Sequence, residues 1–367
     1  MIELQEILRR VSVDDGDDAI LATLVDVQGS GYRLAGARML IDRNGNSIGT
    51  VSGGCLEADI LERARNVLKR GEPIVVSYDT TKDENSLFGL GMGCRGVVRV
   101  LLEPARNNDA LAFIRDCFDR REQGVVSTLI STTSNIGEGL GSKLFLKNDA
   151  FTGISLNGLS SQVESDAAIV LRESRSRTNI YETADSHVEF FHEVISPPTA
   201  ILIFGAGHDA VPLARLAGRM GWQVAVFDHR PAWASADRFP EAEELIVSRP
   251  ENIEEEIFAD CQSVAVVMNH NYDLDRVILG RLLTSSCRYI GMLGPKQRRE
   301  RLLEELRVQG SRFDESQLAK LYAPVGLDIG ASTPEGIALS IVAEIQAVLS
   351  GREGGPLKYR HAPIYDR

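Results

Sequence analysis

The chain of 367 residues is long enough for two domains, and its hydrophobic content of 43% is typical of a globular protein with a substantial core. A net charge of −12 argues against nucleic acid and anionic membranes as partners, and no apolar run approaches the roughly 20 residues of a membrane span. The sequence has five cysteines and no CxxC pair, and its acidic N-terminus is unlike a secretory signal. We therefore predict a cytoplasmic protein with reduced thiols.

The first half of the chain has the apolar patterning of a mixed α+β domain. Helices are expected at residues 3–10, 56–69 and 107–122, and strands at 19–27, 39–41, 48–51, 74–78 and 97–102. Asn44-Gly45 predicts a hairpin turn between two of these strands. Further strands are expected at 125–131, 143–146 and 188–194, with a helix within 153–176. We find no internal repeat in the sequence.

Ser196-Pro197-Pro198 is the most linker-like point of the chain. We therefore predict an N-terminal domain at 1–196, a second domain at 197–350 and a tail at 351–367. In the second domain, strands are expected at 201–204, 224–227, 244–247, 263–268 and 289–293, an extended segment at 324–329, and helices after Gly207 and at 252–258, 273–283, 297–308 and 334–349. The last helix has an N-cap signature, Ser332-Thr333-Pro334-Glu335.

Residues 200–228 have the pattern strand, glycine turn, helix, strand, which opens a dinucleotide-binding α/β fold. Gly205 permits the tight turn, and Gly207 lets a phosphate approach the backbone at the positive end of the helix dipole. Asp228 lies 21 residues after Gly207, where a carboxylate can bind ribose hydroxyls. The pattern predicts a Rossmann-like, doubly wound parallel sheet, and it leaves open whether a dinucleotide binds.

Three histidines are expected at the carboxyl edge of this sheet, where open α/β sheets bind their ligands. His208 lies in the glycine turn, His229 follows Asp228, and His270 lies just past the fourth strand. Each of them is also compatible with a surface position or a supporting role.

Two cysteines of the first domain lie in glycine-rich loops. Cys55 follows Gly53 and Gly54 and precedes a helix, whose dipole would stabilise a thiolate. Cys94 lies in GLGMGCRG, where the glycines leave the backbone open to a close ligand. The alternative for both is that they are small packed residues in turns.

Basic residues accompany these thiols, because Arg33 and Arg38 flank a glycine and Arg95 follows Cys94. The arginines and thiols together form a set suited to an anionic ligand. The other three cysteines are expected in the core: Cys117, Cys261 and Cys287. The spacings of structural zinc sites, nucleophile elbows and P-loops are all missing from the sequence.

These segments together resemble the XdhC/CoxI family of molybdenum-hydroxylase maturation factors over nearly the whole chain. In the first domain the resemblance rests on GSGYRLAGARMLID, IGTVSGGCLEADI and FGLGMGCRGVVRVLLEP. In the second it rests on ILIFGAGHDAVPLARLAGRMGWQVAVFDHRP, RYIGMLGPKQRRERLL and PVGLDIGASTPEGIALSIVAEIQAV.

The resemblance implies an accessory chaperone that binds the molybdenum cofactor (molybdopterin) transiently. Such a protein assists sulfuration of the cofactor by a cysteine desulfurase-type donor and inserts it into xanthine dehydrogenase or a related molybdenum hydroxylase. The resemblance also implies that Cys55 is the first candidate for contact with molybdenum and Cys94 the second. A glycine loop with Arg33 and Arg38 suits the phosphate of the cofactor, and a thiolate suits the metal.

Two other functions stay open at this point: an NAD(P)-dependent oxidoreductase that uses Gly205–Asp228, and a scaffold whose glycines only shape loops. The oxidoreductase would need an acid–base set, and His208 and His270 have neither an ordered partner in the sequence nor a Tyr-x-x-x-Lys pair beside them. The chaperone is therefore favoured, and we expect it to be a homodimer. The sequence leaves open which hydroxylase is served and which cysteine contacts molybdenum.

Overall fold

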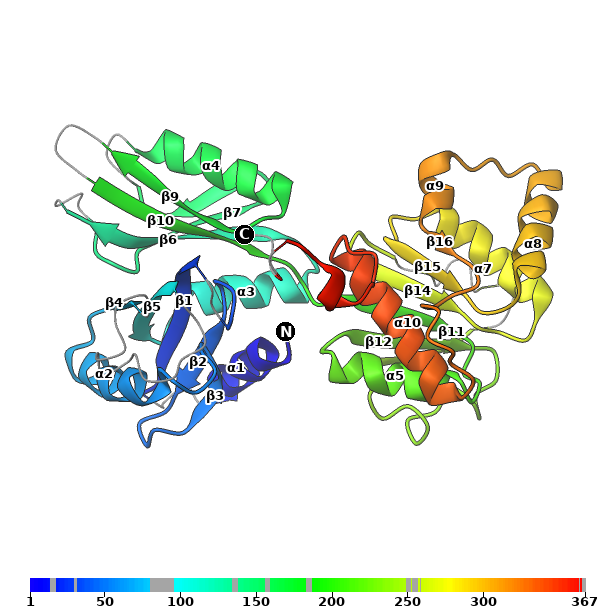
Figure 1. Cartoon of the computed structure of the whole chain (residues 1–367), viewed down its shortest axis with the longest axis horizontal. Coiled ribbons are helices and arrows are strands. Elements are labelled where there is room, and N and C mark those ends of the chain that lie inside the picture. Colours follow the sequence, from blue (N-terminus) through cyan, green and yellow to red (C-terminus); the bar gives the residue numbers. More distant parts are fainter. Residues whose placement is uncertain are drawn as a thin grey trace. The chain divides into compact units, whose positions relative to one another are not determined.

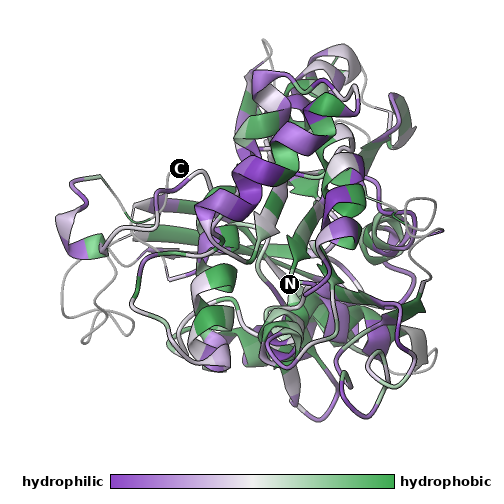
Figure 2. Cartoon of the chain, turned by 90° about the vertical axis from the view of Figure 1, so that its right-hand side faces the viewer, coloured by the Kyte–Doolittle hydropathy of each residue, from purple (hydrophilic) through white to green (hydrophobic). Residues whose placement is uncertain are grey.

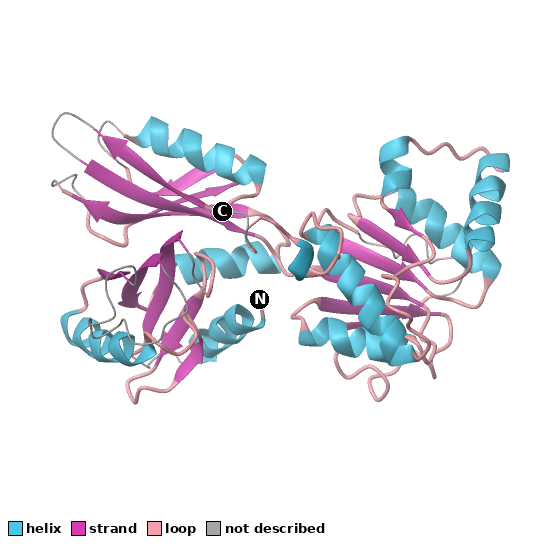
Figure 3. Cartoon of the chain, in the orientation of Figure 1, coloured by secondary structure: helices cyan, strands magenta, loops and turns pink. Residues whose placement is uncertain are grey.

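The computed structural model describes residues 1–13, 18–29, 32–79, 96–133, 138–155, 159–182, 187–248, 252, 257, 259–362 and 364. The chain divides into two compact units, Met1–Pro197 (unit 1) and Pro198–Arg367 (unit 2), each with its own sheets and helices (Figures 1 and 3). Cys94, Arg95 and most of the helix predicted at 252–258 lie outside the described residues.

Unit 1 contains two five-stranded antiparallel sheets. The first sheet has the order β3 (Ser47–Gly49), β2 (Arg38–Ile41), β1 (Ile20–Gly29), β5 (Gly96–Pro104) and β4 (Ile74–Asp79). The second has the order β8 (Ala150–Gly153), β7 (Lys143–Lys147), β6 (Gly124–Thr132), β10 (His187–Ile195) and β9 (Arg177–Glu182). The helices of this unit are α1 (Ile2–Val13), α2 (Glu57–Arg70), α3 (Asp109–Asp119) and α4 (Ser160–Glu173).

Most of these elements lie within three residues of their predicted positions, and the mixed α+β class is confirmed. The strands β8 and β9 were not predicted, and the helix expected within 153–176 is confined to α4. Both missed strands lie at the edges of the second sheet, and Tyr181 is the only buried residue in them. An edge strand with few buried side chains lacks the apolar alternation from which a strand is predicted.

Unit 1 is built from one arrangement of elements used twice. The first half runs β1-β2-β3-α2-β4-β5 and the second runs β6-β7-β8-α4-β9-β10, and their sheets have corresponding strand orders. The expectation of no internal repeat is therefore wrong for the structure. The repeat is not visible in the sequence, because it consists of the order of elements and the pairing of strands. Most side chains can be exchanged without changing either of these.

The two halves repeat the same turn between their first two strands. Leu24 donates its N–H to Ala37 and accepts from Gly36, and Leu129 donates to Ser142 and accepts from Gly141, all at 2.7–2.9 Å between N and O. This correspondence relates residues of the first half to residues 105 positions later in the second.

A glycine ends the β-hairpin in each half for the same steric reason. Gly49 and Gly153 have φ values of +81° and +108°, which disfavour any side chain. A Cβ atom would lie 2.4 Å from the carbonyl oxygen of Arg38 in the first case and 2.3 Å from that of Lys143 in the second. Only glycine lets the two backbones approach so closely.

Among the ion pairs that cross between the halves, two are the most buried. The guanidinium of Arg38, in the first half, donates to Glu193 of the second, with Nη1 2.7 Å from Oε1. Lys143, which corresponds to Arg38, places Nζ 2.5 Å from Oε2 of Glu103 in the first half. These four side chains are at most 10% exposed. The packing of one half against the other thus depends on opposite charges that would be costly to leave unpaired.

We predict that Glu193→Gln lowers the free energy of unfolding by about 3 kcal/mol, because Arg38 would stay charged and buried without its counter-charge. Urea denaturation measures this loss. The double variant Arg38→Met with Glu193→Leu is expected to lose much less than the sum of the single variants. An unchanged urea midpoint for Glu193→Gln would show that the pair does not hold the halves together.

The second half pairs a buried histidine with a serine, His192 with Ser127, where the first half pairs Leu102 with Ala22. His192 is fully buried, with Nδ1 2.7 Å from Ser127 Oγ and Nε2 2.8 Å from Tyr181 OH. Tyr181 donates its only hydroxyl proton to Asp166 at 2.8 Å, so Nε2 of a neutral His192 donates to the tyrosine. Burial lowers the pKa of His192 from 6.5 to about 4, despite the opposing charge of Asp166.

This network predicts a pH dependence of stability. Above pH 6.5 His192 is neutral in both states, and as pH falls towards about 4 only the unfolded state gains the proton. The free energy of unfolding should therefore fall by about 3 kcal/mol over this range, beyond the loss from other groups.

The first half supplies the matched control, because the residues that pair at the corresponding positions are Ala22 and Leu102. The double variant Ser127→Ala with His192→Leu copies that pair. We expect its stability, measured by urea denaturation at several pH values, to change less between pH 6.5 and 4 than that of the parent. An equal slope would exclude His192 as the cause.

Unit 2 has one parallel six-stranded sheet. Its strand order is β13 (Glu244–Val247), β12 (Gln223–Asp228), β11 (Ala200–Phe204), β14 (Ser263–Val267), β15 (Tyr289–Met292) and β16 (Leu321–Tyr322). Its helices are α5 (Ala210–Arg219), α7 (Tyr272–Thr284), α8 (Lys296–Val308), α9 (Glu315–Ala319) and α10 (Pro334–Leu349), followed by a short 3₁₀ helix, Leu357–Tyr359. The order of strands reverses at β11, which confirms the Rossmann-like fold.

The strands of this sheet are apolar on both faces because helices cover both. Ile201 and Ile203 pack with α5 and α10, while Leu202 and Phe204 pack with α7 and α8. The helices alternate hydrophobic and hydrophilic residues around predominantly hydrophobic strands (Figure 2). The predicted cap of α10 is confirmed, since Thr333 Oγ1 accepts from the N–H of Gly336 at 3.2 Å. None of the described helices is both long and apolar enough to cross a membrane.

Candidate functional site

The segment from 50 to 56, called the thiol loop here, connects β3 to α2 and carries Cys55. Gly53, Gly54 and Cys55 are exposed, whereas Ser52 and Leu56 on either side are buried. Gly54 has a φ of +104° and open space around the position of a Cβ atom. The loop therefore presents a thiol and bare backbone to a ligand while its two ends are fixed in the core.

Glu57, at the first position of α2, holds the thiol loop in place. Its carboxylate accepts from Thr50 Oγ1 at 2.7 Å, from the N–H groups of Ser52 and Leu56 at 3.1 and 3.2 Å, and from the Ser52 hydroxyl. Burial acts to raise the pKa of Glu57, but the hydrogen bonds from Ser52 and Thr50 outweigh it, and the pKa is lowered. An ionised acceptor thus organises the loop around Cys55.

Tyr32, which was not among the predicted site residues, lies beside the thiol loop. The ring of Tyr32 lies 3.5 Å from the Cβ position of Gly53, so the segment before β2 contacts this loop. Gly96 begins β5 and pairs with Gly29 at the end of β1, but Cys94 lies outside the described residues.

The two arginines predicted to bind a phosphate have protein partners. Arg33 forms an ion pair with Glu3 of α1, and Arg38 is held by Glu193 and donates to the carbonyl of Gly36 at 3.0 Å. Arg38 is only 4% exposed. Its charge contributes to the contact between the two halves, and a phosphate contact for either arginine stays a prediction.

The remaining cysteines differ from one another in burial. Cys117 and Cys287 are buried, as predicted, and burial raises the pKa of each thiol to about 11. Cys261 is exposed, so its assignment to the core is wrong. It lies in the turn before β14, and a single apolar residue next to a strand does not reveal on which side of the turn its side chain lies.

The glycine turn of unit 2 lies where the strand order reverses. Gly205 has a φ of +109°, and a Cβ there would lie 2.9 Å from both the carbonyl oxygen of Met268 and Oδ1 of Asn269. A Cβ atom at Gly207 would have Nε2 of His270 as its nearest neighbour, 4.0 Å away. The structure therefore brings the turn after β11 and the end of β14 together, and it leaves the backbone at Gly207 accessible.

Asp228, at the end of β12, is engaged by the protein itself. Its Oδ2 accepts from the N–H of Ala206 and from Nη2 of Arg230, and its Oδ1 accepts from the N–H and Nε of Arg230, all at 2.8–2.9 Å. The Arg230 hydrogen bonds lower the pKa of Asp228 to about 2, although burial opposes the shift. This carboxylate is a structural anion in the fold.

A cluster of side chains that the sequence did not reveal surrounds the turn. Arg230 and Arg238 lie over the ring of Trp233, with guanidinium carbons 4.3 and 4.6 Å from its centroid, and His208 meets that ring edge-on at 5.4 Å. We call Arg230, Trp233 and Arg238 the guanidinium cluster. Arg238 also donates to the carbonyl of Ala206 at 2.7 Å, which joins the cluster to the turn.

A further ion pair lies on α7 and α8. Asp275 is 1% exposed and its Oδ2 lies 2.7 Å from Nη2 of Arg298. Burial raises the pKa of Asp275, and Arg298 only partly counters it. This pair fixes the start of α8, which directly follows β15 and the Gly294 turn.

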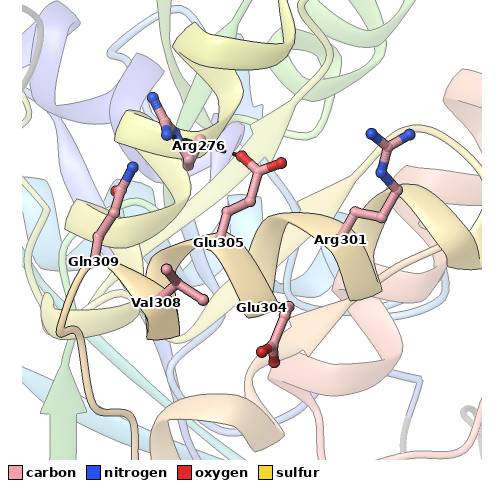
Figure 4. A pocket seen from close by; sticks show the side chains of 6 residues that line it. All are labelled: Arg276, Arg301, Glu304, Glu305, Val308 and Gln309. Carbon is pink, nitrogen blue, oxygen red and sulfur yellow. Dashed lines mark ion pairs between the residues drawn. The ribbon is translucent and has the colours of Figure 1, made fainter.

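A surface pocket of about 420 Å³ lies between α7 and α8 (Figure 4). It is lined by Arg276, Arg301, Glu304, Glu305, Val308 and Gln309. Neither the glycine turn nor a cysteine contributes to it, and its charges are mixed, so we do not assign the functional site to this pocket. Among the residues whose placement is described, no three His, Cys, Asp or Glu side chains gather as a metal site.

Comparison with known protein families gives a match in each of the two units. Residues 12–79 match the family model described as "XdhC and CoxI family", and residues 201–345 match the "XdhC Rossmann domain". A protein of Bacillus subtilis (strain 168) named as a probable xanthine dehydrogenase subunit is 32% identical over 335 residues, covering 91% of this chain and 94% of that protein.

Two further relatives are similar over most of their length. "Molybdenum cofactor insertion chaperone PaoD" of Escherichia coli (strain K12) is 22% identical over 333 residues, covering 91% of this chain and 84% of that protein. A crystal structure titled as a xanthine dehydrogenase from Bacillus halodurans has a TM-score of 0.76 and 30% identity, covering 98% of this chain and 99% of that one.

We predict that Glu57→Gln loosens the thiol loop, because a neutral amide with one acceptor oxygen replaces an ionised carboxylate. Amide hydrogen exchange at Ser52 and Leu56 should accelerate about tenfold, the equivalent of about 1.4 kcal/mol. Glu62→Gln, an exposed position of the same helix, is the matched control. Unchanged exchange in Glu57→Gln would show that the loop does not depend on this carboxylate.

Proposed function

The chain belongs to the XdhC and CoxI family, and from this premise we propose that it is a chaperone that binds the molybdenum cofactor and inserts it into xanthine dehydrogenase or a related molybdenum hydroxylase. The single observation that carries the proposal is the exposed thiol of Cys55 in a loop that Glu57 holds rigid. A relative similar over most of its length is itself named as a molybdenum cofactor insertion chaperone.

The residues of the thiol loop fit such a ligand. A cysteine thiolate is a soft donor suited to a transition metal, and exposure lets a bulky pterin reach it. Gly53 and Gly54 are exposed and present bare backbone beside the thiol, and the start of α2 favours negative charge there. Bound at this loop, the cofactor would supply the molybdenum, and the chain would supply a ligand and a defined orientation.

We predict that Cys55→Ala abolishes most cofactor retention, with at least a tenfold loss, while the thermal unfolding midpoint stays unchanged because the side chain is exposed. Molybdenum analysis and pterin mass spectrometry of the purified protein measure retention. Cys261→Ala removes an exposed thiol from unit 2 and is the matched control. Equal retention in Cys55→Ala and the parent would remove the central claim.

Cys94 is the second proposed contact, and in the sequence it lies two residues before Gly96, which begins β5 and pairs with Gly29 at the end of β1. Unit 2 is proposed to bind a nucleotide such as NAD(P) at the Gly205–Gly207 turn. Its accessible backbone at Gly207 and the start of α5 support this site, with His208 and His270 beside it. An oxidoreductase is less well supported, because the sequence offers no acid–base set, such as a Tyr-x-x-x-Lys pair, to act beside a bound nucleotide.

The setting in which the chain works is also part of this proposal. A cysteine desulfurase-type protein would donate sulfur to the bound cofactor, and the hydroxylase would receive it. The chain is proposed to act as a cytoplasmic homodimer. Free thiols at Cys55 and Cys261, both exposed, suit a reducing compartment.

A further inference from the structure

We propose that unit 2 selects a dinucleotide whose adenosine ribose carries a 2′-phosphate, and that Arg230 recognises this phosphate. The inference rests on the nucleotide site proposed for the Gly205–Gly207 turn and defines the ligand more narrowly. It is independent of cofactor binding at Cys55.

Asp228 has little capacity left to accept hydrogen bonds from a ligand. A carboxylate has about four acceptor positions, and those of Asp228 receive the Ala206 N–H, the Arg230 N–H, and Nε and Nη2 of Arg230. Its side chain has no exposed surface. A ribose diol could bind this carboxylate only by displacing a bidentate, charge-assisted pair, which two neutral hydroxyls do not replace.

The end of β12 offers a ligand a cation instead. The side chain of Arg230 is 40% exposed while that of Asp228 is covered, so the accessible group at this position is positively charged. Arg238, whose guanidinium also lies over the ring of Trp233, adds a second positive charge. The guanidinium cluster together with the Asp228 carboxylate has a net charge of +1, which favours a phosphate over a neutral diol.

Both cations are held in place by the protein before a ligand arrives. Arg230 is fixed by Asp228 and by the ring of Trp233 at 4.3 Å. Arg238 is fixed by the same ring and by the carbonyls of Ala206 and Trp233, at 2.7 and 2.8 Å. Because the protein already restricts both side chains, binding loses little side-chain entropy.

Hydrogen bonds connect the guanidinium cluster to the glycine turn. Arg238 bonds to Ala206, the residue between the two turn glycines, and Asp228 bonds to the N–H of that same residue. A pyrophosphate at the Gly207 backbone and a phosphate at Arg230 would thus be two groups of one ligand. The guanidinium plane of Arg230 would in addition offer a stacking surface to the adenine.

Isothermal titration calorimetry of the full-length protein with NADP⁺ and NAD⁺ tests the proposal without any variant. We expect NADP⁺ to bind at least tenfold more tightly than NAD⁺, and 2′,5′-ADP to compete with it better than 5′-AMP. Equal affinities, or a preference for NAD⁺, would overturn the selection. Failure of all four compounds to bind would overturn both the nucleotide site and its selectivity, and would leave the Cys55 result untouched.

The variants Arg230→Gln and Arg230→Lys assign the effect to the residue. Arg230→Gln should reduce NADP⁺ affinity at least tenfold and remove the preference over NAD⁺. Arg230→Lys keeps the charge opposite Asp228, guards against loss of folding, and should give an intermediate preference. Arg219→Gln, at the exposed last turn of α5, is the control and should behave as the parent. A preference that survives in a folded Arg230→Gln protein would exclude Arg230.

Discussion

The carboxylate of Asp228 is the interaction on which the ligand edge of unit 2 depends. It joins the turn after β11 to the segment after β12, because it accepts from Ala206 on one side and from Arg230 on the other. Without a buried anion there, the N–H of Ala206 would lack an acceptor and Arg230 would lose the partner that positions it. The glycine turn, the stacked Trp233 and the two guanidinium groups are therefore one structural element.

In unit 1, buried charges are likewise paired, and the pairs join its two repeated halves. Each half places one basic residue at the start of its second strand, and each basic residue meets a glutamate from the other half. Neither half alone supplies counter-charges for these buried residues. The two halves are therefore held together by ion pairs as well as by apolar contacts. With this framework shared, the thiol loop occurs in the first half and the His192 network in the second. The two copies thus carry different side chains on the same arrangement of elements.

The sequence allowed prediction of those features that depend on local patterning. The apolar run from Ile201 to Phe204, the glycine turn and the cap at Thr333 each involve only a few neighbouring residues, and each was found where it was expected. Arg38 shows what local patterns leave out. Its position next to glycines suggested a phosphate ligand, but its partner Glu193 lies 155 residues away in the chain. A pattern of a few neighbouring residues cannot predict a partner so far away in the chain.

The role expected for Asp228 shows a different limit. A carboxylate at the end of the second strand indicates ribose binding only if its acceptor positions are open, and the side chain two residues later decides that. Here Arg230 and the N–H of Ala206 occupy them, so the carboxylate orients a cation in this structure. The consequence is that a Rossmann pattern fixes where a ligand lies more firmly than it fixes which groups of the ligand are recognised. Recognition depends on how the buried charges at that edge are already paired.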